Sequence, residues 1–256
     1  MEIRHQKIAL ISGASRGIGR ATALALAADG VRILAHYGNS ASDAKSLVEK
    51  IQSAGGDAEA VQADLETADG ALELARLARS AIGDRLDILV ANAGISKGAA
   101  LEEQNVEDSD RLFAINVRSP FFLVQQLLPV LGVGSSVVLL SSLGARFVPG
   151  SPGQAGIPSL SVYSATKGAL GTLVKHWAFA LGPRGIRVNA VAPGVIATDM
   201  SHFTKTDAGK ELTLGMQALK RIGQADDVAD VIAFLTSEKA RWITGVILPV
   251  DGGSKL

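Results

Sequence analysis

The sequence predicts a single-domain α/β fold, a doubly wound parallel sheet of seven strands with helices on both faces. Three observations lead to this prediction. Short apolar runs alternate with longer segments of helical period along all 256 residues. A glycine-rich turn follows the first apolar run, and no internal repeat, low-complexity tract or charged linker interrupts the alternation. One continuous pattern of this length fits a single domain over residues 1–256.

The expected elements follow one another as strand and then helix. Each expected strand is a short aliphatic run, and each expected helix is a longer segment in which apolar residues recur with a helical period. Right-handed crossovers then place helices on both faces of the sheet. In chain order the elements are strand 7–12, helix 17–28, strand 31–36, helix 41–54, strand 58–63, helix 68–82, strand 86–91, helix 106–131, strand 135–141, helix 161–181, strand 186–192, helix 226–236 and strand 244–249.

Two segments break this rhythm, and each follows the carboxyl end of an expected strand. Residues 143–160 are rich in Gly and Pro, and residues 200–216 are polar and only weakly helical. Ligands of open α/β sheets bind at the carboxyl edge of the strands. We therefore expect these segments to form the walls and lid of a substrate cleft, the alternative being ordinary surface loops.

Composition favours a small-molecule partner. The 25 Lys and Arg residues balance 25 Asp and Glu residues without a basic block, so the charge pattern of a nucleic-acid or acidic-membrane binder is missing. The absence of cysteine excludes disulfides, thiolate nucleophiles and Cys-ligated zinc. The four histidines lack metal-ligand spacing, so no metal site is expected.

The chain ends bear on localisation. The first residues run directly into a strand, without a secretory leader, and no run of 18 apolar residues is present, so we expect a cytoplasmic protein with no membrane partner. The last residues, Ser254-Lys255-Leu256, form a peroxisomal address in a eukaryote, whereas in a bacterium they match by chance.

The turn after the first strand has the glycine spacing G-x-x-x-G-x-G, formed by Gly13, Gly17 and Gly19. Glycine lets the backbone turn sharply and approach a pyrophosphate, and the amides at the start of the following helix supply donors for that anion. Glycine-rich turns also occur for packing reasons. The strand before and the helix after the turn favour a dinucleotide site.

The end of the second strand indicates which dinucleotide is bound. NAD sites usually carry an acid there for the ribose 2′-hydroxyl, but this sequence reads Ala-His36-Tyr-Gly-Asn39-Ser40. Arg16 in the turn, with Asn39 and Ser40 as neutral donors, can accept a 2′-phosphate instead, so NADP(H) is favoured over NAD(H). The alternatives are a solvated Arg16 and a His36 at the strand edge with no ligand.

Tyr163 and Lys167 lie four residues apart at the start of the fifth helix, on one helical face. The ordinary pKa of tyrosine, about 10, is too high for acid–base work at neutral pH. A nearby ammonium and an oxidised nicotinamide both favour the phenolate, so Tyr163 can exchange a proton with a carbonyl or alcohol oxygen. Alone, such a pair is more typical of an ordinary helix surface.

Together with motifs at the other strand ends, the sequence resembles the short-chain dehydrogenase/reductase family over essentially its whole length, in the branch that includes 3-oxoacyl-[acyl-carrier-protein] reductases. The resemblance implies a Rossmann fold. The matching pieces are the Gly13/Gly17/Gly19 turn, Asp64-Leu65, Asn92-Ala93-Gly94, Asn116-Val117, Ser141-Ser142, the Tyr163/Lys167 pair, Pro193-Gly194 and Asp251-Gly252-Gly253.

The resemblance also implies which residues bind the cofactor. The segment after the third strand would border the adenine, that after the fourth would lie against the ribose, and that after the sixth would cradle the nicotinamide. The expected cofactor-binding residues are Gly13, Ser15, Arg16, Gly17, Ile18, Gly19, Asn39, Ser40, Asp64, Leu65, Asn92, Ala93, Gly94, Tyr163, Lys167, Pro193, Gly194, Ile196 and Thr198.

Four residues are implied as catalytic. Tyr163 would be the acid–base, Ser142 would hydrogen-bond the substrate oxygen, Lys167 would hold the nicotinamide ribose, and Asn116 would anchor a water that links Lys167 to solvent. Each polar residue taken singly is equally plausible as a cap or turn former.

One departure from the family pattern concerns the serine. Ser142 and Tyr163 lie 21 positions apart, farther than in most of the family. Ser141 or Ser151 therefore competes with Ser142, and the extra residues should reshape the substrate mouth.

The resulting hypothesis is an NADP(H)-dependent oxidoreductase that acts on a small-molecule ketone or secondary alcohol and forms a homotetramer. Its alternatives are a 3-oxoacyl-[acyl-carrier-protein] reductase and a catalytically inactive NADP(H) sensor. Residues 128–134, just before the expected fifth strand, carry no charge, which argues against docking of an acidic carrier protein.

Overall fold

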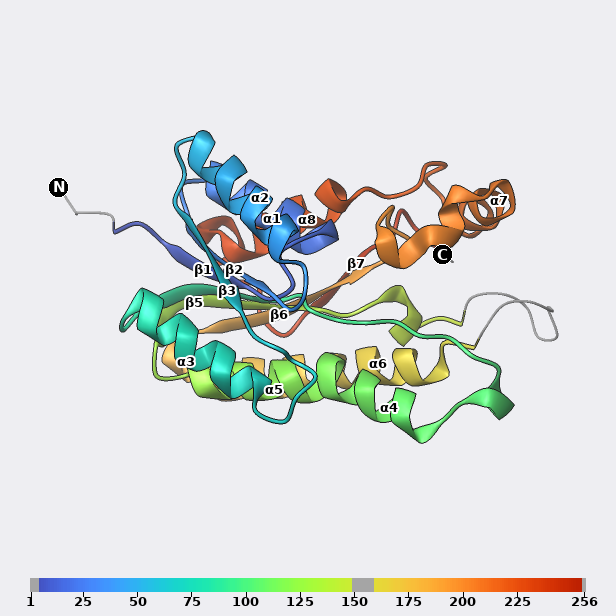
Figure 1. Cartoon of the computed structure of the whole chain (residues 1–256), viewed down its shortest axis with the longest axis horizontal. Coiled ribbons are helices and arrows are strands. Elements are labelled where there is room, and N and C mark those ends of the chain that lie inside the picture. Colours follow the sequence, from blue (N-terminus) through green and yellow to red (C-terminus); the bar gives the residue numbers. More distant parts are fainter. Residues whose placement is uncertain (1–4, 149–158, 255–256) are drawn as a thin grey trace.

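The computed structural model describes residues 5–148 and 159–254, and its centre is a parallel sheet of seven strands in the order β3-β2-β1-β4-β5-β6-β7 (Figure 1). Every neighbouring pair is parallel. The strands are β1 (Ile8–Ile11), β2 (Arg32–Tyr37), β3 (Ala58–Gln62), β4 (Leu86–Ala91), β5 (Leu131–Leu140), β6 (Arg187–Pro193) and β7 (Ile247–Val250). The sequence prediction of a doubly wound α/β domain is confirmed.

Helices cover both faces of the sheet (Figure 1). One face carries α1 (Gly17–Ala28), α2 (Ala41–Ser53) and α8 (Ala225–Thr236). The other carries α3 (Gly70–Ile82), α4 (Val106–Phe113), α5 (Ser119–Leu127) and α6 (Ser161–Leu181), and α7 (Asp207–Met216) lies apart, near the carboxyl terminus. Among the described residues, no helix is both long and apolar enough to cross a membrane.

The alternation of side chains along the strands produces two cores. In β1, Leu10 faces the α3–α5–α6 layer, whereas Ala9 and Ile11 face the α1–α8 layer, and all three are fully buried. Because both faces are covered, these strands read as continuous apolar runs. For this reason the strands could be predicted from apolar runs alone, although their sequences do not alternate between apolar and polar residues.

The expected helix 106–131 was wrong in its end and in its uniform α-helical geometry, although the helical run from 106 to 127 is unbroken. The chain forms α4, then a π-helix at Ala114–Arg118, then α5, which ends at Leu127. The strand β5 begins at Leu131, four residues before the expected position 135. Its first residues include Gly132 and Gly134, the latter at φ 88°. Glycine has a low strand propensity, so nothing in the sequence indicates that the strand begins here.

The segment 200–216 is more ordered than its composition indicated. It contains a short 3₁₀ stretch, Asp199–Lys205, followed by α7, whose N-cap Thr206 accepts a hydrogen bond from the Gly209 amide. Most of the other irregular segment, 143–160, lies outside the described residues, as does Ser151.

The strand order reverses between β1 and β4, which lie side by side in the middle of the sheet. In doubly wound folds this switch point opens a crevice at the carboxyl ends of the strands. The loops after β1, β4, β5 and β6 all leave the sheet at this edge.

Candidate active site

The turn after β1 requires its glycines. Gly13 and Gly17 adopt φ of 64° and 55°, a left-handed conformation that side chains disfavour. A Cβ at Gly19 would collide with the Gly13 carbonyl oxygen and the Asn92 side chain. The turn therefore brings the start of α1 close to the backbone of β1 and β4, and it leaves the space that a bound phosphate needs.

Asn92, at the end of β4, holds this turn. Its Nδ2 donates to the Ser12 oxygen at 2.8 Å and to the Gly13 oxygen at 2.9 Å, and the amide of Ala93 donates to Ser12 Oγ at 3.0 Å. Asn92 thus orients the turn through its carbonyl groups. Whether this segment also touches a cofactor ribose stays a prediction.

Arg16 lies at the N-cap of α1 with an exposed side chain. Its guanidinium is 3.8 Å from the Asp199 carboxylate, on the segment after β6. Asn39 is exposed, and Ser40 directly precedes α2. The side chains expected to bind a 2′-phosphate are thus accessible on the α1–α2 side of the carboxyl edge.

Lys167 is buried in the first turns of α6. Its Nζ donates to the Leu140 oxygen at 2.8 Å and lies 5.8 Å from the centre of the Tyr163 ring. Burial lowers the pKa of Lys167 to about 8. The ammonium therefore lies beside the tyrosine, as the four-residue spacing predicted.

The environment of Tyr163 disfavours the phenolate in the protein without ligands. Burial raises the pKa of Tyr163 above its ordinary value, and a hydrogen bond with Ser142 only partly opposes that shift. Desolvation of the phenolate is the larger effect here. The expected lowering of this pKa by Lys167 together with an oxidised nicotinamide stays a prediction for the cofactor-bound protein.

The two competing serines have different environments. The Ser141 hydroxyl is buried and donates to the Lys167 main-chain oxygen at 3.0 Å. Ser142 is half-buried, its Oγ accepts from the Gly144 amide at 3.1 Å, and it hydrogen-bonds Tyr163. Ser142 is therefore the serine that faces the tyrosine hydroxyl, whereas Ser141 supports α6.

Asn116 lies in the π-helix, fully buried. Its Oδ1 accepts from the Ile95 amide at 2.9 Å, and its Nδ2 donates to the Ile95 oxygen and to Thr166 Oγ1, both at 3.0 Å. Thr166 in turn donates to the Tyr163 main-chain oxygen at 2.6 Å. The side chain of Asn116 therefore joins the loop after β4 to α6, and sequence reasoning missed Thr166 as the connecting residue.

The remaining expected residues lie at the same edge. Asp64 forms the turn after β3, where its carboxylate accepts from the Glu66 amide at 3.0 Å, and Leu65 is buried. After β6, Ile196 is buried, and the methyl group of Thr198 lies 3.4 Å from the position of a Cβ on Gly17. The segment after β6 thus lies against the glycine turn.

The loop after β4 also contacts the segment before α6. Ala99 and Ser159 form an isolated antiparallel bridge, with the Ala99 amide donating to the Ser159 oxygen at 3.2 Å. This pairing closes one side of the site beside Tyr163. Sequence reasoning predicted a wall here without identifying its partner.

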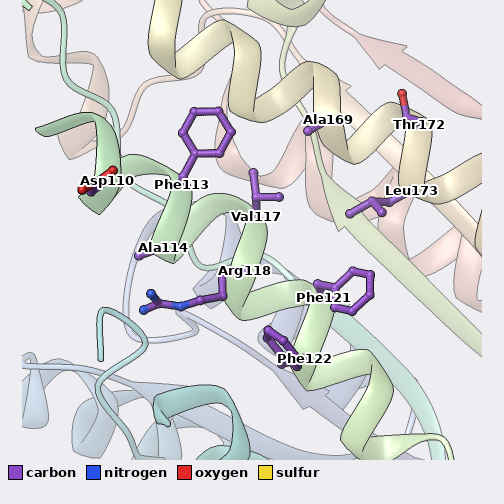
Figure 2. Close-up of a pocket in the computed structure, with 10 residues that line it drawn as sticks. All are labelled: Asp110, Phe113, Ala114, Val117, Arg118, Phe121, Phe122, Ala169, Thr172 and Leu173. Atoms are coloured by element: carbon purple, nitrogen blue, oxygen red, sulfur yellow. The ribbon is translucent and has the colours of Figure 1, made fainter. Parts of the chain in front are cut away.

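A separate apolar groove of about 830 Å³ lies between α4–α5 and α6 (Figure 2). None of the expected site residues lines it. Its walls are Asp110, Phe113, Ala114, Val117, Arg118, Phe121, Phe122, Ala169, Thr172 and Leu173. The groove is therefore a surface feature on the outer side of the helical layer and not the catalytic cleft.

Comparison with known proteins gives consistent matches along the chain. A family model described as enoyl-(acyl carrier protein) reductase matches residues 13–255. The chain is 42% identical over 250 residues to an uncharacterised oxidoreductase of Methylorubrum extorquens, covering 96% of this chain and 97% of that protein. It is 38% identical over 250 residues to the 3-oxoacyl-[acyl-carrier-protein] reductase FabG of Staphylococcus epidermidis, covering 96% and 98%.

A solved structure shares the fold closely. The angucycline C-6 ketoreductase LanV with bound NADP superposes with a TM-score of 0.87 at 36% sequence identity, covering 96% of this chain and 95% of that one. The similarity thus extends over nearly the full length of both proteins.

Proposed function

Because this chain belongs to the short-chain dehydrogenase/reductase family, we propose that it is an NADP(H)-dependent oxidoreductase that interconverts a ketone and a secondary alcohol. The observation that carries the proposal is the arrangement of Tyr163 beside both Ser142 and Lys167, at the sheet edge to which the glycine turn also belongs. Burial lowers the pKa of Lys167, and ionisable groups with shifted pKa values cluster at functional sites.

Each residue has a task in this reaction. The nicotinamide supplies the hydride to the carbonyl carbon when it is bound. Tyr163 donates its hydroxyl proton to the carbonyl oxygen, and Ser142 donates a hydrogen bond to the same oxygen, which stabilises the charge that develops there. The positive charge of Lys167 favours the phenolate that Tyr163 leaves behind, and oxidation of an alcohol reverses these steps.

The residues present fit a dinucleotide cofactor. The left-handed Gly13 and Gly17 leave the start of α1 open to a pyrophosphate, and the side chain of Thr198 lies directly opposite. The absence of an acid at the end of β2 and the accessible Arg16 support NADP(H) over NAD(H). LanV, a relative of similar length, carries NADP in its structure.

A direct experiment tests the proposal. The purified protein is mixed with NADPH and a panel of ketones, and oxidation of the cofactor is followed by its absorbance. Turnover that depends on both ketone and Tyr163 supports the proposal. Tight NADPH binding without turnover on any ketone would instead identify a cofactor sensor.

A second candidate is reduction of carrier-bound 3-oxoacyl groups, favoured by the similarity to FabG. Against a dedicated carrier enzyme, residues 128–134 are uncharged, and the nearby Arg184 already donates to the Leu128 and Leu131 oxygens. We therefore propose that free ketones are reduced at least as well as carrier-bound chains. A preference in kcat/KM for the carrier form that collapses with added salt would reverse this order.

A further inference from the structure

His36, near the end of β2, is bonded to two other strand ends. Its side chain is 2% exposed. Its Nδ1 lies 3.0 Å from the Gly13 amide, which donates to it, and its Nε2 lies 3.0 Å from the Ala63 oxygen. The main-chain oxygen of His36 also accepts from the Ala14 amide at 2.8 Å. His36 thus lies near the end of β2, as expected, and its ring is buried between the two segments that it contacts.

These contacts define one protonation state. An amide can only donate, so Nδ1 must be unprotonated, and a carbonyl can only accept, so Nε2 must carry the hydrogen. A single neutral tautomer satisfies both bonds. Burial lowers the pKa of His36 to about 4, so this neutral form prevails at neutral pH.

The bonds fix the glycine turn from two directions. Asn92 holds the turn by its carbonyl oxygens, and His36 holds it by the amides of Gly13 and Ala14. Since these two amides are already bonded, an incoming phosphate must be bound by the amides that follow them in the turn and at the start of α1.

On its other side, the His36 ring contacts the segment that follows β3, through Nε2 and the Ala63 oxygen. Ala63 directly precedes Asp64 and Leu65, which form the loop after β3. His36 therefore spans the distance between the glycine turn and this loop with one rigid ring. Both segments belong to the end of the site that would receive the adenosine half of the cofactor.

We propose that neutral His36 is a positioning residue for the adenosine half of NADP(H). Its ring bridges Gly13 to Ala63 and thereby sets the distance between the glycine turn and the loop after β3. The inference rests on the proposed function for its ligand. His36 acts through the backbone and does not reach the reacting atoms, so its effect belongs to cofactor affinity and not to the chemical step.

Three variants test this role. His36→Leu fills similar space without either bond, His36→Asn offers one acceptor and one donor, and Gln62→Ala removes only an exposed bond to the Gly38 oxygen at the same edge. For His36→Leu we expect the Kd and KM for NADPH to rise on the order of tenfold or more, the cost of two lost bonds. Its kcat at saturating NADPH should stay within about twofold of the wild type. His36→Asn should restore only part of the affinity, because its Oδ1 can replace Nδ1 as the acceptor for the Gly13 amide but its Nδ2 does not reach the Ala63 oxygen.

A measurement on the wild-type protein without cofactor is independent of these variants. Nitrogen NMR of the His36 ring should show an unprotonated Nδ1 and a protonated Nε2, and the Gly13 amide should exchange slowly with solvent. It keeps the inference testable if His36→Leu does not fold.

The outcomes separate the two proposals. Wild-type protein that binds no NADPH would contradict the proposed function, whatever the state of the ring. If the wild type binds NADPH but His36→Leu binds it equally well, or if the ring carries its hydrogen on Nδ1, the positioning role is wrong. A fall in kcat equal to the loss of affinity in His36→Leu would likewise overturn it.

Discussion

Asn116 and Ile95 exchange two hydrogen bonds, with the Ile95 amide donating to Oδ1 at 2.9 Å and Nδ2 donating to the Ile95 oxygen at 3.0 Å. Few side chains can pair with one residue's backbone in both directions, because this needs an acceptor and a donor on the same planar group. The pair lies at the π-helix between α4 and α5, and π-helical turns are frequent at functional sites.

We predict that the Asn116→Asp variant is less stable than the wild type and has a lower kcat. A carboxylate of the same shape still accepts from the Ile95 amide, but it cannot donate to the Ile95 oxygen or to Thr166. The loss of two buried bonds should lower the free energy of unfolding by about 2–4 kcal/mol, measured by denaturant titration. Thr166→Ser, which keeps the hydroxyl, is the matched control and should behave like the wild type. An Asn116→Asp protein of normal stability and rate would show that the pair is dispensable.

How much of this site the sequence predicts depends on whether a residue has a local signature. The spacing of Tyr163 and Lys167 and the glycines at 13, 17 and 19 predicted their placement, because helix periodicity and left-handed turns are local properties. The bonds of Asn116 were not predictable, since Ile95 lies 21 residues away and meets it only in the folded chain.

For the fold as well, features with a local sequence signal were predicted, and features that depend on tertiary contacts were missed. The ends of α1 and α6 were predicted without error, because glycine turns and proline mark them. The π-helix was missed because its residues continue a helical apolar pattern, and only tertiary contacts shift the backbone bonds. The start of β5 was missed because its glycines have weak strand propensity. The strand begins at Leu131 because that residue pairs with Leu86 of β4.

We predict that Tyr163→Phe lowers kcat by about a thousandfold or more and leaves the Kd for NADPH nearly unchanged. The change removes one hydroxyl, which is the proton donor and the group bonded to Ser142. Single-turnover rates and cofactor binding measured on the same preparation decide the point. Near-normal turnover would place the acid–base elsewhere.

We predict that Lys167→Met is inactive but more stable than the wild type at neutral pH. The folded-state pKa of about 8 lies below the ordinary value of 10.5, so the unfolded chain binds the proton more tightly, and folding a charged Lys167 costs about 3 kcal/mol below pH 8. The unpaired Leu140 oxygen in the variant offsets part of this gain.

The pH dependence of the stability difference between Lys167→Met and the wild type tests this burial cost. As the pH rises from about 8 to 10.5, the wild-type lysine loses its charge in both states and the cost disappears. The stability gap between Lys167→Met and the wild type should therefore narrow over this window in denaturant titrations. A gap that stays constant, or a variant less stable at pH 7, would contradict the burial cost.

We predict opposite effects from the two partners of the Arg16–Asp199 contact. Arg16→Ala should lower kcat/KM for NADPH by about tenfold or more with little change for NADH, because a 2′-phosphate loses its cation. Asp199→Asn should raise kcat/KM for NADPH modestly, by about two- to threefold, since the carboxylate 3.8 Å away no longer competes for the guanidinium. Equal losses with both cofactors in Arg16→Ala would remove the basis for NADP(H) preference.

We predict, finally, that the protein is a homotetramer and that the groove on α4, α5 and α6 is one of its interfaces. Figure 2 shows side chains from α4 to α5, among them Phe113 and Phe121, on one side of the groove and those of α6 on the other. Phe113 is 42% and Phe121 36% exposed, and Phe121 stacks edge-on against Phe122. An apolar surface of this kind on the outside of a helical layer is typical of an isologous contact with a second copy. The edge strand β7, with partly exposed Leu248, and the partly exposed Val246 just before it offer a second contact, and two such contacts make a tetramer.

Light scattering at micromolar concentration should therefore give four times the 26.4 kDa chain mass. Phe121→Glu places a charge in the groove and should yield smaller species, because an isologous contact brings two copies of that charge together. Val133→Glu is the matched control, since Val133 is 92% exposed near the start of β5, outside both surfaces, and this variant should remain tetrameric. A monomeric wild type, or a Phe121→Glu protein that keeps the wild-type mass, would show that the groove is not an interface between copies of this chain.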